Sequence, residues 1–354
     1  MDLSGNPLWS NVLVFAVASV FVWQAGTRVA EFADELAQRY HLSRAFLGLF
    51  MLSTISSLPE IATSFTAAAH ANAALAINNL LGSILLQVTL LALADLLTGK
   101  RALTAVVPDA LVLLQGSLNI VLLALVVIAI TLGDVQVFHV GIWSLALIAA
   151  TGFAAFALLR AGRERKPWLV NPDDANSTEA KQEEKRTMSR KYRDDSGTLL
   201  FGKLALAMLT ILTAGAALAY TGEALGMQTG LGQSFAGVAL VSTATSLPEV
   251  STVFASVRAG LYTMAISDIL GTNILNVALV GGVDLIDTSG AALDTAGDFS
   301  ALAAMLGILV TGIFMAGLSE RANRTYLHMG LDSILVLCVY VAGMFMLYRI
   351  RDGG

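Results

Sequence analysis

Residues 56–60 read SSLPE, within the stretch LGLFMLSTISSLPEIATSFTAAA at residues 47–69. The stretch is otherwise apolar or small and is long enough to cross a bilayer, which takes about 20 residues. Proline breaks a helix and glutamate is costly in lipid, so a proline followed by a glutamate is unexpected there. A near copy, TSLPE, occurs at residues 245–249 within VALVSTATSLPEVSTVFASV. A motif of this kind that occurs twice in apolar sequence indicates a function.

The composition is that of a membrane protein. The 354 residues are 56% hydrophobic and 13% charged, against about 25% charged residues in soluble domains. The apolar runs do not alternate with polar residues as barrel strands do, so they predict helices. We expect an all-α polytopic membrane protein with ten transmembrane helices, at about 9–30, 44–70, 73–97, 103–131, 138–159, 199–221, 230–256, 262–286, 299–318 and 327–348.

The Lys and Arg residues predict the orientation. If the N-terminus lies outside, 19 of the 21 Lys and Arg residues fall in segments on the cytoplasmic side, as the positive-inside rule requires. The charged segment 160–198 is then a cytoplasmic linker. We expect a multi-pass protein of the cytoplasmic (inner) membrane with both termini outside.

The chain contains an internal repeat. A shift of 189 residues places SLPE at 57–60 on SLPE at 246–249, and residues 42–88 then show 17 identities without a gap. The repeats divide the chain into residues 1–159, with a core repeat at about 42–97, and residues 199–354, with a core repeat at about 231–286. Five spans is an odd number, so the two five-helix repeats are expected to be inverted. Inverted repeats with broken helices at the midplane characterise secondary transporters.

The two motifs provide oxygen atoms inside the membrane. Pro59 and Pro248 cannot donate to the carbonyls four residues back, at Ile55 and Ala244. A carbonyl freed at membrane depth needs another partner, and a cation can be that partner. Glu60 and Glu249 add carboxylates, and no basic residue within the core spans could pair with them.

The third and eighth spans add further oxygens. Asn79, Ser83 and Gln87 are spaced four residues apart and so share one helix face. The same face of the second repeat carries Asp268, Thr272 and Asn276. Carboxylate, hydroxyl, amide and carbonyl oxygens suit a hard cation such as Ca²⁺. The absence of His and Cys from the set argues against zinc or copper.

These residues resemble the signature of the calcium/cation antiporter superfamily, and most closely that of the microbial sodium/calcium exchangers. The family pattern is G-T-S-L-P-E followed by G-N-x-x-G-S-N, and TSLPE at 245–249, SSLPE at 56–60, ILGTN at 269–273 and LLGSI at 80–84 are its counterparts. The resemblance covers all ten spans. It implies alternating access in which Ca²⁺ and a counter-ion compete for one site, with Glu60 and Glu249 as central ligands. We expect the counter-ion to be Na⁺, because TSLPE is the sodium-type motif. The candidate metal ligands are Glu60, Glu249, Ser56, Ser57, Thr245, Ser246, Ser83, Gln87, Thr272, Asn276 and Asp268.

The chain departs from the family pattern in its acidic residues. Gln87 and Asn276 stand where the family tends to have Asn and Asp, so a third carboxylate is missing, and Asp268 replaces the Asn of the GN pair. Asp268 lies about 12 Å along the helix from Asn276, so we do not expect both to bind one ion. Asp268 is interpreted either as a vestibule residue that attracts cations or carries a proton, or as a helix-start carboxylate facing the headgroups.

Alternative functions remain open from the sequence. Exchange of Ca²⁺ for H⁺ uses the same kind of site, and a cation channel could also line a pore with carboxylates. A protease would need a dyad; Asp109 and Asp298 form a symmetric pair but lack the flanking Tyr and Gly patterns. Asp95, Asp284, Asp109 and Asp298 lie near span ends and are expected to serve structure or gating. No enzymatic cofactor, nucleic acid or protein partner is expected, only the transported ions Ca²⁺ and Na⁺ or H⁺ and the lipid bilayer.

Overall fold

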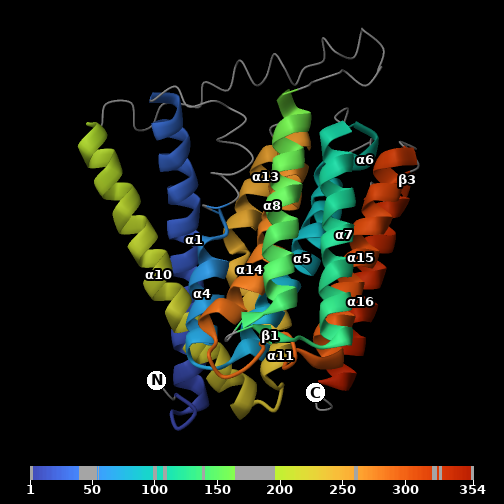
Figure 1. Cartoon of the computed structure of the whole chain (residues 1–354). Coiled ribbons are helices and arrows are strands. Elements are labelled where there is room, and N and C mark those ends of the chain that lie inside the picture. Colours follow the sequence, from blue (N-terminus) through green and yellow to red (C-terminus); the bar gives the residue numbers. More distant parts are fainter. Residues whose placement is uncertain are drawn as a thin grey trace, which may run out of the picture.

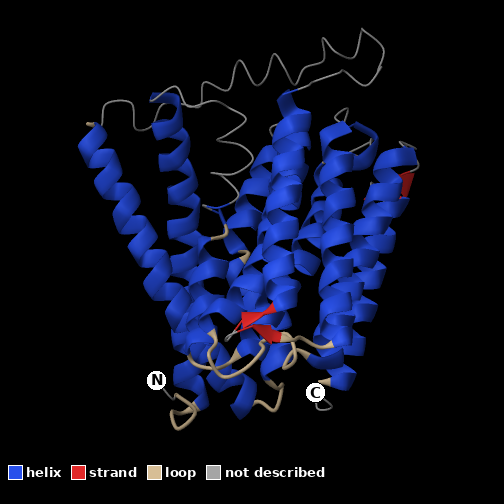
Figure 2. Ribbon diagram, in the orientation of Figure 1, coloured by secondary structure: helices blue, strands red, loops and turns tan. Residues whose placement is uncertain are grey.

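A computed structural model describes residues 3–39, 54, 56–98, 102–106, 110–137, 140–163, 196–258, 262–320, 325–326 and 329–351. Within these ranges the regular structure is helical apart from two short hairpins (Figure 2). The longer helices are α1 (Leu8–Arg39), α4 (Leu58–Ala69), α5 (Ala73–Ala94), α7 (Ala110–Leu132), α8 (Ile142–Arg163), α10 (Gly197–Gln228), α13 (Leu247–Arg258), α14 (Tyr262–Ile286), α15 (Gly297–Glu320) and α16 (Leu331–Ile350). Short helical pieces are η2 (Asp95–Leu97), α6 (Leu103–Val106), α11 (Gln233–Ala236), the π-helical turn η3 (Gly237–Val241) and α12 (Ser242–Thr245).

Eight helices in the described ranges are long and apolar enough to cross a membrane. A further crossing consists of two pieces, Gln233–Thr245 and Leu247–Arg258, bent by 51° at the break between them. The predicted run at 44–70 lies partly outside the described residues, and its described part ends in α4. The multi-pass helical class is therefore confirmed, while the count of ten spans stays a prediction.

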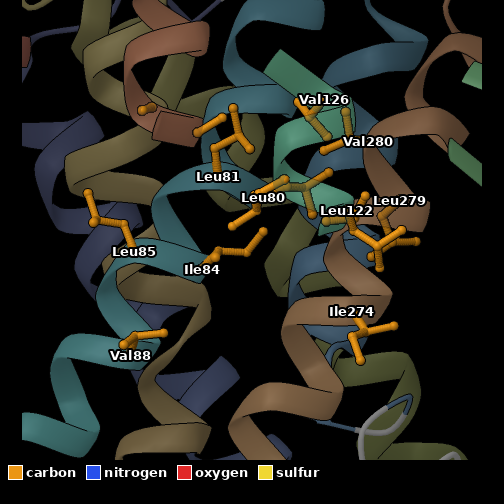
Figure 3. Packing of buried hydrophobic residues seen from close by; sticks show 14 of the residues in the cluster. Leu80, Leu81, Ile84, Leu85, Val88, Leu122, Val126, Ile274, Leu279 and Val280 are labelled. Carbon is orange, nitrogen blue, oxygen red and sulfur yellow. The ribbon is translucent and has the colours of Figure 1, made fainter. Parts of the chain in front are cut away.

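The central helices of the bundle are α5 and α14. In their apolar windows 78% and 72% of the residues are buried, against 22% for α1 and α16. Figure 3 shows Leu80 and Ile84 of α5, Leu122 of α7 and Val280 of α14, which all belong to one cluster of buried apolar side chains. The polar residues of α5 and α14 are consequently surrounded by protein rather than by lipid.

Glycines let α5 approach the second broken span closely. A Cβ on Gly82 of α5 would lie 2.6 Å from the Cα of Val238, and a Cβ on Gly237 would lie 2.8 Å from the carbonyl oxygen of Leu75. Side chains do not tolerate such distances to backbone atoms, so only glycine allows this contact. The turn η3 therefore packs backbone against backbone on α5, next to the start of α12 and α13.

Helices α1 and α10 pack along each other on one flank of the bundle (Figure 1). Each has 32 residues, which is more than the ~20 needed to span a bilayer. Two glycines related by the 189-residue shift contact the broken spans: a Cβ on Gly26 would lie 2.5 Å from Pro248, and one on Gly215 would lie 2.5 Å from Ala62. The first contact is at a break, and the second is three residues beyond Pro59, so the two contacts are not equivalent.

The two hairpins lie on opposite faces of the bundle (Figure 2). One pairs β1 (Gln136–Val137) with β2 (Val140–Gly141), and the other pairs β3 (Thr325–Tyr326) with β4 (Met329–Gly330). Both ends of the described chain lie on one face, whereas α8 ends and α10 begins on the other (Figure 1). Most of the predicted linker 160–198 lies outside the described residues.

Asp95, at the end of α5, joins the first half of the chain to the hairpin of the second. Its Oδ1 accepts a hydrogen bond from the backbone N–H of Leu103 at 2.6 Å, and its Oδ2 accepts one from the N–H of Gly330 at 2.6 Å. Backbone donors thus engage both oxygens of a buried carboxylate.

Asp284 makes the same bonds 189 residues later in the chain. Its Oδ1 accepts from the N–H of Ala292 at 2.6 Å and its Oδ2 from the N–H of Gly141 at 2.6 Å. Asp298 is exposed in the first turn of α15, and Asp109 lies outside the described residues. The contacts of Asp95 and Asp284 agree with the expected structural role.

We expect Asp95→Asn and Asp284→Asn each to destabilise the protein by about 1.5–3 kcal/mol, because one backbone N–H loses its charged acceptor. The two effects should add, since the sites lie on opposite faces of the bundle. Thermal unfolding of the purified protein measures the change, and Asp298→Asn, at an exposed carboxylate, is the control with a small effect. Unchanged stability with selectively weakened cation binding would contradict the structural role.

Candidate cation site

The second motif interrupts its span, and the first motif lies at the start of a described helix. Helices α4 and α13 each begin one residue before the proline of the motif. Pro248 has no N–H for the carbonyl of Ala244, four residues back. Ile55, the corresponding residue of the first motif, lies outside the described residues. The first turns of both helices lie inside the protein.

Glu60 and Glu249 lie in these first turns and are fully buried. One oxygen of Glu60 and both oxygens of Glu249 lack a hydrogen-bond partner. In the described ranges no Lys, Arg or His forms an ion pair with either carboxylate. A helix N-terminus favours a negative charge, but two buried carboxylates still require a compensating cation or protons. The pair is therefore suited to hold a positive ion.

Ser246 connects the two motifs. Its hydroxyl donates to Oε1 of Glu60 at 3.4 Å and lies 3.3 Å from the hydroxyl of Ser83 on α5. The equivalent serine of the first motif, Ser57, is buried and its hydroxyl has no partner. The structure thus brings Ser246, Ser83 and Glu60 together, and it leaves the Ser57 hydroxyl free to bind a ligand.

The residue before each serine contacts the central helix of the other half. The hydroxyls of Ser56 and Thr272, on α14, are 3.3 Å apart. The hydroxyl of Thr245 donates to Oδ1 of Asn79, on α5, at 3.2 Å. Ser56, Thr245 and Thr272 therefore lie where the two broken spans meet the two central helices.

Gln87 and Asn276 lie one turn beyond Ser83 and Thr272 on their helices. Both amides are fully buried, and neither their oxygens nor their nitrogens have hydrogen-bond partners. An amide oxygen is a good ligand for a hard cation, so both side chains can complete a coordination sphere.

Asp268 lies one turn before Thr272 and has its own partner. It is 6% exposed, and its Oδ2 accepts a hydrogen bond from the hydroxyl of Thr252 at 3.5 Å. The interpretation that Asp268 faces the lipid headgroups is therefore wrong, because the side chain points into the protein. Among the described residues no three His, Cys, Asp or Glu side chains are grouped to hold one metal ion. Further ligands beside two carboxylates would thus be hydroxyl, amide and carbonyl oxygens.

Some polar residues near the site were not recognised from the sequence. Thr252 coincides with Thr63 under the 189-residue shift, which could have indicated it. Asn119 stands in an apolar run, and its Nδ2 donates to the carbonyl of Leu270 at 2.8 Å, two residues before Thr272. In both cases a polar residue within an apolar span was the feature of the sequence that could have indicated the position.

Two curated proteins resemble the chain over most of its length. The putative antiporter CaxA of Alkalimonas amylolytica is 24% identical over 347 residues, which is 96% of this chain and 99% of that protein. The inner membrane protein YrbG of Escherichia coli (strain K12) is 24% identical over 274 residues, which is 77% of this chain and 79% of that protein.

Solved structures share the fold. The H⁺/Ca²⁺ exchanger CAX superposes with a TM-score of 0.66 at 14% identity, over 96% of this chain and 85% of that chain. The sodium-calcium exchanger NCX_Mj superposes with a TM-score of 0.55 at 16% identity, over 96% of this chain and 99% of that chain.

The family profile covers most of the chain. The profile described as "Sodium/calcium exchanger protein" matches residues 10–161 and 199–349. These ranges include both motifs and both central helices and leave out the segment between the halves. This multi-pass membrane protein therefore belongs to the sodium/calcium exchanger family.

Proposed function

We propose that the protein is a secondary antiporter that exchanges Ca²⁺ for Na⁺ across the cytoplasmic membrane. The observation that carries the proposal is the pair of fully buried glutamates, Glu60 and Glu249, without a basic partner and with unpaired oxygens. Family membership supports antiport, and with it a transporter rather than an enzyme. An ion pathway that ends at a buried midplane site suits exchange better than a channel.

In this proposal the ion lies between the first turns of α4 and α13 and the middle of α5 and α14. The two glutamates neutralise the charge of Ca²⁺, and the remaining ligands are Ser56, Ser57, Ser83, Gln87, Thr245, Ser246, Thr272 and Asn276. Ca²⁺ takes six to eight oxygens, which this set can provide with backbone carbonyls at the breaks. All eight of these side chains are buried, which supports their role.

We infer ten spans in two inverted repeats, with both termini outside. The equivalent contacts of Asp95 and Asp284, on hairpins at opposite faces, support the inversion. The two described chain ends lie on the face opposite the end of α8 and the start of α10, the two helices that the basic segment connects in the sequence, and this supports the orientation.

Glu60→Gln and Glu249→Gln should each abolish exchange and weaken Ca²⁺ binding by at least roughly a hundredfold. A neutral amide leaves half of the ion's charge uncompensated in a low-dielectric site, a loss of about 3–5 kcal/mol. Equilibrium binding and uptake of radiolabelled Ca²⁺ by the purified protein measure both effects. Glu320→Gln, at the exposed end of α15, is the matched control. Normal Ca²⁺ flux in either site variant would refute the central role of the glutamates.

Sodium is proposed as the counter-ion because TSLPE at residues 245–249 is the sodium-type motif of the resembled family. Proteoliposomes loaded with Na⁺ should take up Ca²⁺ when the outward Na⁺ gradient is the only driving force. Liposomes with a pH gradient and no Na⁺ should show little uptake. The reverse result would assign the protein to Ca²⁺/H⁺ exchange at the same site, and uptake without either gradient would indicate a channel.

A further inference from the structure

Two positions that the repeat makes equivalent, Asn79 and Asp268, have unequal surroundings. Asn79 is satisfied on both sides of its amide: Oδ1 accepts from Thr245 at 3.2 Å, and Nδ2 donates to the hydroxyl of Ser64 at 2.9 Å. The amide is fully buried and has no unpaired atom. On α5 this position therefore has all its hydrogen-bonding atoms paired within the protein.

Asp268 on α14 does not have both side-chain oxygens paired. Val253 occupies the position that corresponds to Ser64, so no hydroxyl is available there. Among the described residues its carboxylate accepts only a long hydrogen bond, from the Thr252 hydroxyl to Oδ2 at 3.5 Å, and Oδ1 is buried without a partner. In the described ranges no Lys, Arg or His pairs with this carboxylate.

A buried carboxylate with an unpaired oxygen needs a positive partner. Asp268 lies next to Glu249, because the hydroxyl of Thr252 bonds to Oδ2 of Asp268 and to the backbone carbonyl of Glu249. In the described chain, however, no three acidic side chains are grouped to hold one metal ion, so Asp268 does not join Glu60 and Glu249 around a common ion. A single carboxylate is neutralised by a single positive charge, whereas Ca²⁺ would leave a net charge in a medium of low dielectric constant. The charge balance therefore favours a monovalent ion.

Thr252 links this carboxylate to the central site. Its hydroxyl contacts both Oδ2 of Asp268 and, at 3.1 Å, the backbone carbonyl of Glu249. Asp268 is one helical turn, about 6 Å along the axis, from Thr272. Asp268 is buried in the second turn of α14, near the start of that helix.

We propose that Asp268 and Thr252 form a second cation site, for a monovalent ion such as Na⁺ or K⁺, on the side of the central site where α8 ends and α10 begins. The site makes the chain asymmetric, because the equivalent position on the other side is the neutral Asn79. The role of this site, to supply a cation to the exchanger, rests on the proposed function. Binding of an ion to the site can be measured without transport.

The test uses equilibrium binding of radiolabelled Na⁺, Rb⁺ (as a substitute for K⁺) and Ca²⁺ to the purified full chain. In the double variant Glu60→Gln/Glu249→Gln, saturable monovalent binding should persist while Ca²⁺ binding is lost. Adding Asp268→Asn should weaken the residual binding by at least about tenfold. Adding Asp298→Asn instead, at an exposed carboxylate, is the matched control and should change nothing. The stronger of the Na⁺ and Rb⁺ signals identifies the ion.

A second arm leaves the glutamates intact. Asp268→Asn and Thr252→Val should each weaken monovalent binding more than Ca²⁺ binding, whereas Thr63→Val, the repeat counterpart, should not show this selectivity. The inference is overturned if the double variant binds no monovalent ion, or if Asp268→Asn reduces Ca²⁺ binding as much as Na⁺ or Rb⁺ binding. Retained Ca²⁺ binding in the double variant would instead refute the proposed function, and the effect of Asp268→Asn on monovalent binding would still be readable.

Discussion

The structure depends on keeping two carboxylates, Glu60 and Glu249, inside a membrane-spanning bundle where no basic side chain of the described chain pairs with them. Such groups can be placed only where oxygen ligands and protein, rather than lipid, surround them. Pro248 lies at the break of the second span beside Glu249, and Pro59 lies in the first turn of α4 beside Glu60. Helices α5 and α14 supply hydroxyls and amides. The glycine contact of Gly82 with the turn η3 brings one broken span against its central helix. The wider fold therefore serves to surround one polar centre.

Much of this arrangement could be predicted from the sequence, because Pro and Glu are rare in apolar spans and their repetition is informative. The apolar runs predicted the helical class and most span boundaries. The four-residue spacing predicted which residues share a helix face with Ser83 on α5 and with Thr272 on α14. Contacts between helices could not be predicted. That Ser246 reaches Glu60 while Ser57 reaches no partner depends on how the spans pack. The bond from Gly330 to Asp95 joins residues 235 positions apart, which no local pattern encodes.

Beside the motifs, equivalent residues in the two repeats do not make equivalent contacts, in contrast to Asp95 and Asp284. The serine hydroxyl of one motif is bonded and that of the other is not, and Gly26 meets Pro248 whereas Gly215 meets Ala62. A transporter that opens to one side at a time requires this inequality, since a symmetric arrangement would be equally open or closed on both sides. Similar sequences in the two halves thus support two different local structures within one conformation.

The hairpin contacts carry a consequence for how the protein is made. Asp95 of the first half binds Gly330 of the second, and Asp284 of the second half binds Gly141 of the first. This reciprocity is the pattern of an isologous dimer interface, here within one polypeptide. Because the N-terminal half is synthesised first, Asp95 lacks the N–H of Gly330 as a donor until the β3–β4 hairpin has been made. Assembly therefore ends with the docking of two partners, and each half completes the other.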